Sequence, residues 1–313
     1  MRPDAATRYT GDGGTQGRRA AVAAAVGRMA VAAPRRGRRH GGARARLVTA
    51  LLLAFLLAIP TTAVASAQKD ERVYLALGDS LAAGVGATVP DRVGYVPHLA
   101  GFFHGAAHGG ASSTVTVALP GATSASFIGS GRLAQAVAVI DGGSDIVVVT
   151  LDIGGNDLLG LLGPGQPCAN DLASPTCQAA IAAALSGFAT TFPTILGALT
   201  AALARDPGEE QLLVATYYNP MSGTGSPLEA ALDRVLLGAD GKIDCGGNPT
   251  QPGLNDLIAC IAVQHGARVA DVYPLFAGKG AELTHIRTGD THPTNAGHAA
   301  IATAFRRAAR SGA

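Results

Sequence analysis

Residues 73–81 read Val-Tyr-Leu-Ala-Leu-Gly-Asp-Ser-Leu. A short apolar run that breaks at a Gly-Asp pair is typical of a buried strand followed by a tight turn. Ser80 therefore comes directly after the end of a predicted strand. We expect this stretch to form the first strand of the domain and to set the position of its serine.

Four further stretches are apolar or β-branched and are bounded by Gly, Pro, Asn or Asp: residues 114–119, 145–151, 211–217 and 267–272. Helical patterns lie between and after them, at residues 132–140, 177–204, 228–237, 254–265 and 295–309. Pro193 should kink or split the second of these helices. Apolar strands that alternate with helices predict an α/β fold, a doubly wound and mainly parallel five-stranded sheet with helices on both faces. In such sheets ligands bind at the carboxyl ends of the strands, and Ser80, Gly121 and Asn156 each fall just past a predicted strand end.

Residues 1–67 differ in composition from the rest of the chain. They hold 11 of the 24 Lys and Arg residues and two of the 22 acidic residues, which leaves 13 basic and 20 acidic residues in 68–313. Their arginines precede an apolar run at residues 47–59, and small residues at 65–67 offer a cleavage site. The pattern predicts a secretory signal peptide over residues 1–67, cleaved before Gln68, and a single domain over 68–313. An uncleaved anchor is the alternative, and it is the only membrane contact that we expect.

The predicted domain is acidic, with a net charge of −7 from its 13 basic and 20 acidic residues. An acidic domain without a basic stripe argues against nucleic acid as a partner. The chain also lacks a GxGxxG or P-loop match, so we expect no nucleotide cofactor.

The cysteines all lie in the predicted domain, and none has a Cys-x-x-Cys spacing: Cys168, Cys177, Cys245 and Cys260. No nearby histidines complete a zinc ligand set, so we expect no metal site. Four cysteines allow three pairings, and we favour Cys168–Cys177 with Cys245–Cys260 because these pairs close short loops. Free buried thiols are the alternative, although an oxidising destination favours disulfides.

Four short motifs follow one another along the domain, each at a predicted strand end or helix start. They are Gly-Asp-Ser-Leu at 78–81, Pro-Gly-Ala-Thr at 120–123, Gly-Gly-Asn-Asp at 154–157 and Asp-Thr-His-Pro at 290–293. In this order and context they resemble the SGNH hydrolase family, also called GDSL-type lipases and esterases, over essentially the whole domain. The resemblance implies a flavodoxin-like three-layer fold and hydrolysis of carboxylic esters through an acyl-enzyme.

The chemistry of these motifs can also be argued from the residue types. The hydroxyl of Ser80 is a weak nucleophile until a neighbouring base takes its proton, and His292 is the candidate base. Attack on an ester creates an oxyanion that needs preorganised donors. The resemblance assigns these donors to the backbone N–H groups of Ser80 and Gly121 and to the side-chain amide of Asn156. We expect the aspartates of the motifs, Asp79 and Asp157, to brace the loops.

The acid that orients the histidine departs from the family pattern. The family usually places it three residues before the histidine, where this chain has Gly289. Asp290 stands two residues before His292, and residues i and i−2 of an extended segment project to the same side. We therefore favour Asp290 as the third catalytic residue. The alternative is a backbone carbonyl near Gly289, which would leave a Ser80–His292 dyad.

Residues 158–164 read Leu-Leu-Gly-Leu-Leu-Gly-Pro, which is unusually apolar for a loop after a catalytic turn. They are either an acyl-binding wall or the start of a buried helix. The first reading favours a carboxylic ester with an apolar acyl part over a sugar acetyl group. Together with the leader and the motifs, we expect a secreted esterase or lipase that acts on small-molecule or lipid esters as a monomer, without cofactor or metal. The alternatives are a carbohydrate deacetylase or thioesterase on the same site, or a catalytically silent binding protein of the envelope.

Overall fold

The apolar stretch that precedes Ser80 forms strand β1 (Arg72–Gly78), in which every residue after the first is buried. The computed structural model describes residues 71–310, except 207, 209, 244 and 246–250. The predicted leader, residues 1–67, therefore lies outside the described residues.

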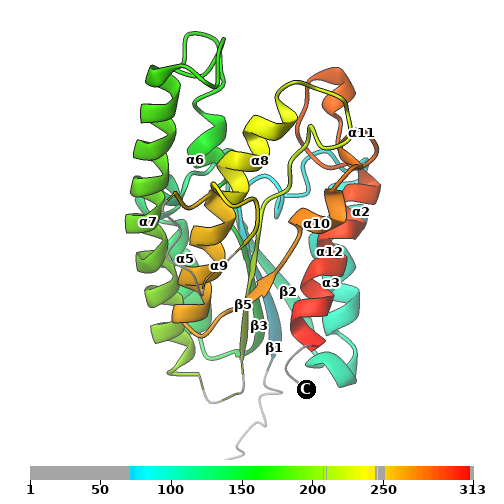
Figure 1. Cartoon of the computed structure of the whole chain (residues 1–313). Helices are drawn as coiled ribbons and strands as arrows, with labels where there is room; N and C mark the ends of the chain where they lie inside the picture. The colour runs from blue at the N-terminus through cyan, green and yellow to red at the C-terminus, as the bar shows by residue number, and fades with distance from the viewer. Residues whose placement is uncertain (1–70, 207, 209, 244, 246–250, 311–313) are drawn as a thin grey trace, which may run out of the picture. The chain divides into compact units, whose positions relative to one another are not determined.

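Within the described residues, five parallel strands form one sheet in the order β2-β1-β3-β4-β5 (Figure 1). The other strands are β2 (Ser113–Ala118), β3 (Asp145–Asp152), β4 (Gln211–Ala215) and β5 (Arg268–Ala270). The chain leaves β1 toward β2 on one side and then crosses to β3 on the other. This reversal is the topological switch point at which doubly wound folds place their ligand sites. The predicted α/β fold class is confirmed.

Helices cover both faces of the sheet (Figure 1). They are α2 (Pro90–Val93), α3 (Tyr95–Phe103), α4 (Ser124–Gly129), α5 (Arg132–Ile140), α6 (Gly155–Leu159), α7 (Pro175–Leu203), α8 (Glu229–Leu237), α9 (Leu254–Gln264), α10 (Tyr273–Phe276), α11 (Gly280–Leu283) and α12 (Asn295–Arg310), with 3-10 turns η1 (Ala106–His108) and η2 (Ile286–Thr288). Helices α3 and α12 pack together on one face, and α5, α7 and α9 lie on the other. The result is a helix–sheet–helix sandwich of three layers.

The sequence predicted that Pro193 kinks or splits this helix, and the split does not occur, because α7 continues through Pro193. Proline removes one helical hydrogen bond, but Phe188 and Phe192 before it and Ile195 after it are fully buried, and this packing holds both halves in one helix. The helix is long and apolar enough to cross a membrane by length and composition alone. Here it packs against α4, α5, α6 and α9, and 28% of its most apolar stretch is buried.

The core is apolar because the strands are buried on both faces. Aromatic side chains pack within and between the layers. Tyr95 of α3 stacks on Phe305 of α12 with ring centroids 5.3 Å apart, and Tyr74 of β1 contacts Phe103 of α3 at 5.1 Å. A fully buried large apolar side chain contributes about 1.5–3 kcal/mol to stability. The carboxyl ends of β1 and β3 are held together by the parallel ladder, which pairs Gly78 with Asp152.

The two disulfides pair the cysteines in sequential order, Cys168 with Cys177 and Cys245 with Cys260. The favoured pairing is thus confirmed. The first bond ties the loop after α6 to the first turn of α7, and the second ties the loop after α8 to α9.

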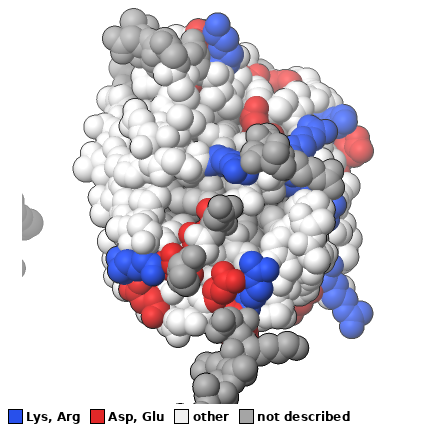
Figure 2. All heavy atoms as spheres, turned by 90° about the horizontal axis from the view of Figure 1, so that it is seen from below, with Lys and Arg blue, Asp and Glu red and all other residues white. Residues whose placement is uncertain are grey.

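At the amino ends of the strands, basic and acidic side chains are interspersed (Figure 2). Two ion pairs lie among the segments that lead into the strands. Arg72 Nε is 2.6 Å from Asp145 Oδ2, and Arg205 Nη2 is 2.8 Å from Asp141 Oδ1. These pairs are solvent-exposed, so each is expected to contribute at most about 1 kcal/mol. The candidate site lies at the opposite, carboxyl ends of the strands.

Candidate active site

Ser80 is positioned by the close approach of β1 to β3. A Cβ atom at Gly78 would lie 2.5 Å or less from the backbone and side chain of Asp152, so only glycine fits at this strand end. The chain then turns, and the N–H of Leu81 donates to Oδ1 of Asp79 at 2.9 Å. After this turn Ser80 lines a cavity, and 8% of the surface of Ser80 is exposed.

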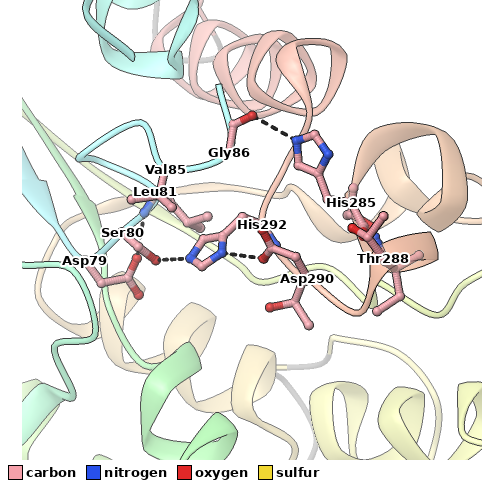
Figure 3. Close-up of polar contacts among 12 residues, drawn as sticks. Asp79, Ser80, Leu81, Val85, Gly86, His285, Thr288, Asp290 and His292 are labelled. Atoms are coloured by element: carbon pink, nitrogen blue, oxygen red, sulfur yellow. Dashed lines mark hydrogen bonds and ion pairs between the residues drawn. The ribbon is translucent and has the colours of Figure 1, made fainter. Parts of the chain in front are cut away.

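The three side chains predicted for catalysis lie in one hydrogen-bonded line (Figure 3). Oγ of Ser80 is 3.0 Å from Nε2 of His292, and Nδ1 of His292 is 2.6 Å from Oδ1 of Asp290. The same carboxylate oxygen accepts the backbone N–H of His292 at 2.9 Å. When Nδ1–H donates to the carboxylate, Nε2 has its lone pair toward the serine hydroxyl. Asp290 thus occupies the position of the third group, although it stands one residue later than in the family pattern.

The electrostatics of Asp290 agree with this arrangement. Burial alone raises the pKa of its carboxyl, but the backbone N–H and imidazole of His292 outweigh burial, and the net pKa lies below its ordinary value. The carboxylate is therefore charged throughout the neutral range and available to an imidazolium.

The loop that carries His292 is held from several sides. The N–H of His285 donates to the carbonyl of His292 at 3.0 Å, and the hydroxyl of Tyr218 donates to the carbonyl of Thr291 at 2.9 Å. Nε2 of His285 contacts the carbonyl of Gly86 at 2.9 Å, which joins this loop to the segment after Ser80 (Figure 3). His285 therefore has a structural role, and the loop holds the imidazole on the serine.

His298, the other histidine near the site, is also structural. Its Nδ1 accepts the N–H of Tyr95 at 3.3 Å, and its Nε2 lies 3.0 Å from the carbonyl of Val85. Burial lowers the pKa of His298 to about 4, so the ring is neutral at pH 7. The neutral tautomer with a proton on Nε2 satisfies both contacts.

Hydrogen bonds of Asn156 connect the segments that carry the three predicted oxyanion-hole residues, Ser80, Gly121 and Asn156. Gly121 has a φ of 78°, a left-handed conformation that favours glycine. Asn156 lies in the first turn of α6, and its Nδ2 donates to the carbonyl of Ala122 at 3.0 Å and to Oδ2 of Asp79 at 3.1 Å. These bonds link the Gly121 turn, the Asn156 turn and the Ser80 turn. Both N–H groups of the amide already have acceptors in the protein.

Two buried carboxyl groups lie beneath the serine. Asp79 N–H donates to Oδ1 of Asp152 at 3.0 Å, and the hydroxyl of Tyr95 donates to Oδ2 of Asp152. Burial raises the pKa of both carboxyls, and the charge of Asp79 raises that of Asp152 further. Asp157 accepts the N–H and the hydroxyl of Ser124 at 2.8 and 2.6 Å. The bracing role predicted for the aspartates of the motifs agrees with these contacts.

Tyr217 is a site residue that the sequence did not single out. It follows β4, lines the cavity, and its hydroxyl donates to Oδ2 of Asp79 at 2.7 Å. A Cβ atom at Gly155 would lie 2.4 Å from its ring, so the second glycine of the motif at 154–157 leaves room for this tyrosine. The contact spans 138 residues and has no local sequence signal.

A cavity of about 400 Å³ opens beside Ser80 and His292. One wall is the run of leucines at residues 158–162, which includes the end of α6, and the facing wall includes Leu232 and Val235 of α8. The Cys168–Cys177 disulfide and Ile181 belong to the same apolar cluster. The leucine run ends helix α6 and lines the cavity, and Leu159 and Leu162 are exposed. The alternative reading, the start of a buried helix, is therefore wrong. Among the described residues, no group of His, Cys, Asp or Glu is arranged to hold a metal ion.

The fold and the site define an α/β protein with a serine–histidine–aspartate arrangement at the carboxyl ends of a parallel sheet. Residues 76–300 match the GDSL-like lipase/acylhydrolase family, and the chain belongs to this family. No curated protein matches the sequence significantly.

Solved structures with a similar fold include an extracellular lipase from Streptomyces rimosus, at 24% identity and a TM-score of 0.52, covering 76% of this chain and 99% of that one. A lipase from a goat rumen metagenome has 19% identity and a TM-score of 0.50, covering 75% and 96%. An acetylxylan esterase from Geobacillus stearothermophilus has 17% identity and a TM-score of 0.50, covering 76% and 94%. At these identities the likeness shows the shared fold.

Proposed function

We propose that this protein is a secreted hydrolase that cleaves carboxylic esters with apolar acyl groups through an acyl-enzyme on Ser80. The observation that carries the proposal is the hydrogen-bonded arrangement of Ser80, His292 and Asp290 beside a mainly apolar cavity. His292 is 3.0 Å from Oγ of Ser80 and 2.6 Å from Oδ1 of Asp290, and Ser80 and His292 line the cavity. Family membership gives ester hydrolysis as the general chemistry.

In the proposed acylation step, Nε2 of His292 accepts the hydroxyl proton while Oγ of Ser80 bonds to the ester carbonyl carbon. The negative charge moves to the carbonyl oxygen, which the N–H groups of Ser80, Gly121 and Asn156 stabilise. The intermediate then collapses, the bond to the alcohol oxygen breaks, and His292 returns its proton to that oxygen. The acyl group remains on Ser80 and the alcohol leaves.

Deacylation repeats these steps with water as the nucleophile. His292 takes a proton from water, the hydroxide oxygen bonds to the acyl carbon, and Oγ of Ser80 leaves with the proton from His292. Asp290 holds the imidazole in the tautomer with its proton on Nδ1 and stabilises the imidazolium that forms in both steps. No cofactor or metal is needed for this sequence.

The cavity supports an apolar acyl group as the preferred substrate part. Most of its lining is apolar, chiefly leucines, while Ser80, Asn156 and His292 supply polar groups at the catalytic serine. Asn170 and Asp171 add polar groups to the wall beside Cys168. A pocket that is apolar except for a few convergent polar groups orients a ligand by its reactive end. The acyl chain therefore lies along the leucines, with the carbonyl at the serine.

Two features support secretion and removal of the leader. The leader pattern of residues 1–67 has the charge, the apolar run and the small residues of a signal peptide. The two disulfides are stable in an oxidising compartment. We propose a monomer that begins at Gln68, with an ester as its partner and no bound nucleic acid.

The test is hydrolysis of p-nitrophenyl esters from acetyl to palmitoyl by the secreted protein, with Ser80→Ala as the control. We expect the highest kcat/KM on a medium or longer acyl chain and no turnover above background in Ser80→Ala. An optimum at acetyl esters, with release of acetate from acetylated xylan, would favour a carbohydrate deacetylase. A preference for acyl thioesters would favour a thioesterase, and no turnover of any substrate would favour a binding protein.

A further inference from the structure

The side-chain amide of Asn156 has a feature that the family motif does not explain. The oxygen and nitrogen ends of an asparagine amide have the same shape, so only neighbouring groups decide which end faces a site. Here the nitrogen end faces two acceptors, the carboxylate of Asp79 and the carbonyl of Ala122. A rotated amide would place its oxygen against both acceptors and would offer no donor to an oxyanion.

This orientation depends on the charge of Asp79. An ionised carboxylate accepts only, and so selects the N–H end of the amide. A protonated carboxyl can donate to the amide oxygen and would therefore allow the rotated form. Burial of Asp79 raises the pKa of its carboxyl, which favours the protonated form. Donors are thus needed to keep Asp79 ionised.

The groups that face Asp79 favour its ionisation and so act against burial. They are the N–H of Leu81, the hydroxyl of Tyr217, a hydrogen bond with Asp152 and the charge of a protonated His292, and each lowers the pKa of the Asp79 carboxyl. The charge of Asp79 in turn raises the pKa of Asp152. Asp152 and Tyr217 lie outside the four sequence motifs, and Tyr217 contacts Oδ2, the oxygen of Asp79 that also accepts from Asn156. Its hydroxyl makes the shorter of the two bonds to Oδ2, 2.7 Å against 3.1 Å for Asn156.

Tyr217 is itself rigidly held. Asn255 of α9 accepts the backbone N–H of Tyr217 and donates to its carbonyl, both at 2.8 Å, and Asn255 is fully buried. Burial, together with the nearby charge of Asp79, raises the pKa of the Tyr217 hydroxyl well above its ordinary value. The hydroxyl is therefore protonated at neutral pH and can donate to Asp79.

We propose that Tyr217 is a positioning residue: its hydroxyl holds the Asp79 carboxylate, which in turn fixes the Asn156 amide with its N–H groups at the oxyanion site. This inference rests on the proposed ester hydrolysis. When the substrate oxygen arrives, the amide shares an N–H with it, while Asp79 prevents the amide from rotating.

The test compares Tyr217→Phe with Tyr273→Phe. Tyr273→Phe is the control because it also removes a tyrosine hydroxyl that donates to an aspartate: the hydroxyl of Tyr273 donates to Oδ1 of Asp233 at 2.5 Å. Tyr273 does not line the cavity. We expect kcat of Tyr217→Phe to fall about 10- to 100-fold with KM within about threefold of wild type, the usual range for a group that orients a reacting one. Tyr273→Phe should keep the wild-type kcat.

Two further measurements separate positioning from general destabilisation. If Tyr217 acts through the charge of Asp79, adding Tyr217→Phe to an Asp79→Asn variant should lower kcat by no more than about twofold. A double-mutant cycle measures this coupling. In a plot of kcat against pH, the fall on the acidic side should also move to higher pH in Tyr217→Phe. Asp79 then has one hydrogen-bond donor fewer and takes up a proton more readily. If Tyr217→Phe does not fold, Asp79→Asn alone carries the test, and it should lower kcat without raising KM.

Exchange of the Asn156 side-chain amide protons can be measured without any substrate, so it tests the role of Tyr217 separately from ester hydrolysis. In nitrogen-15 NMR spectra, the Asn156 side-chain amide protons should exchange with water about tenfold faster or more in Tyr217→Phe than in wild type or Tyr273→Phe. A wild-type protein without esterase activity would refute the proposed function, and this exchange would still test the contact. A Tyr217→Phe kcat within twofold of wild type, an equal loss in the Asp79→Asn background, or unchanged amide exchange would overturn the proposal.

Discussion

Replacement of Asp290 by asparagine is the sharpest test of the site geometry, because Asp290 stands one residue away from the family position. Asparagine keeps the shape and removes the charge. Its amide can also donate to Nδ1 of His292, which forces the imidazole proton onto Nε2 and removes the lone pair that faces Ser80. The expected effect is therefore on kcat and not on ester binding.

The size of the effect follows from the exposure of the pair. Where the triad aspartate is fully buried, the same substitution costs about 10⁴-fold in kcat. Here the side chains of His292 and Asp290 are 31% and 47% exposed, so water screens part of their interaction. The 2.6 Å contact and the second bond from the backbone N–H of His292 still fix the ring. We expect a loss of about 10²- to 10³-fold, or about 2.7–4.1 kcal/mol of transition-state stabilisation.

The assay is steady-state hydrolysis of p-nitrophenyl butyrate by purified Asp290→Asn at pH 7–8, with the folded state checked by thermal unfolding. Asp141→Asn is the matched control, because it removes the same charge from an ion pair with Arg205 at the opposite end of the sheet. A kcat for Asp290→Asn within tenfold of wild type would refute the reasoning. It would assign the orientation of His292 to a backbone carbonyl near Gly289 and leave a Ser80–His292 dyad.

Three further predictions follow from the leader, the buried histidine and the cavity. Intact mass of the secreted protein, with and without reduction, should show a chain that begins near Gln68 and contains two disulfides; retained leader residues or alkylation of unreduced thiols would contradict this. The free energy of unfolding should fall by about 3 kcal/mol in all as pH drops from 6.5 to about 4, because the lowered pKa of His298 means that unfolding takes up a proton. In urea titrations His298→Gln should lose less stability over this range, and an equally steep fall in the variant would refute the assignment. Leu232→Trp should narrow the cavity and move the optimum in the p-nitrophenyl ester series to shorter chains; an unchanged optimum would place the acyl group elsewhere.

Many of the strands and helices could be predicted from local sequence patterns. The apolar run before Gly78 predicted β1, because its residues are buried on both faces and must be apolar throughout. The predicted strand at 267–272 shortened to Arg268–Ala270, since its last residues pack without continuing the ladder. Helix α3 was missed although its buried residues have helical spacing, because it is only nine residues long and contains Pro97 and Gly101, which disfavour a helix.

The candidate site was predictable only where residues lie in motifs. The glycine turns placed Ser80 and Asn156 at strand ends, and their local geometry follows from those glycines. The partners from distant segments carried no signal: Tyr217 contacts Asp79 across 138 residues, and His285 contacts Gly86 across 199. Such contacts depend on the packing of the whole sheet and cannot be found from one stretch of sequence.

The most direct test of the central claim is covalent labelling of the folded protein with a fluorophosphonate, which reacts with serines activated by a neighbouring base. Peptide mass spectrometry should find one adduct per chain, on Ser80. Ser80→Ala should take up none, and His292→Ala should be labelled at least about 100-fold more slowly because its serine lacks a base. An unlabelled wild-type protein, or an adduct that persists in Ser80→Ala, would contradict the assignment of Ser80 as the nucleophile.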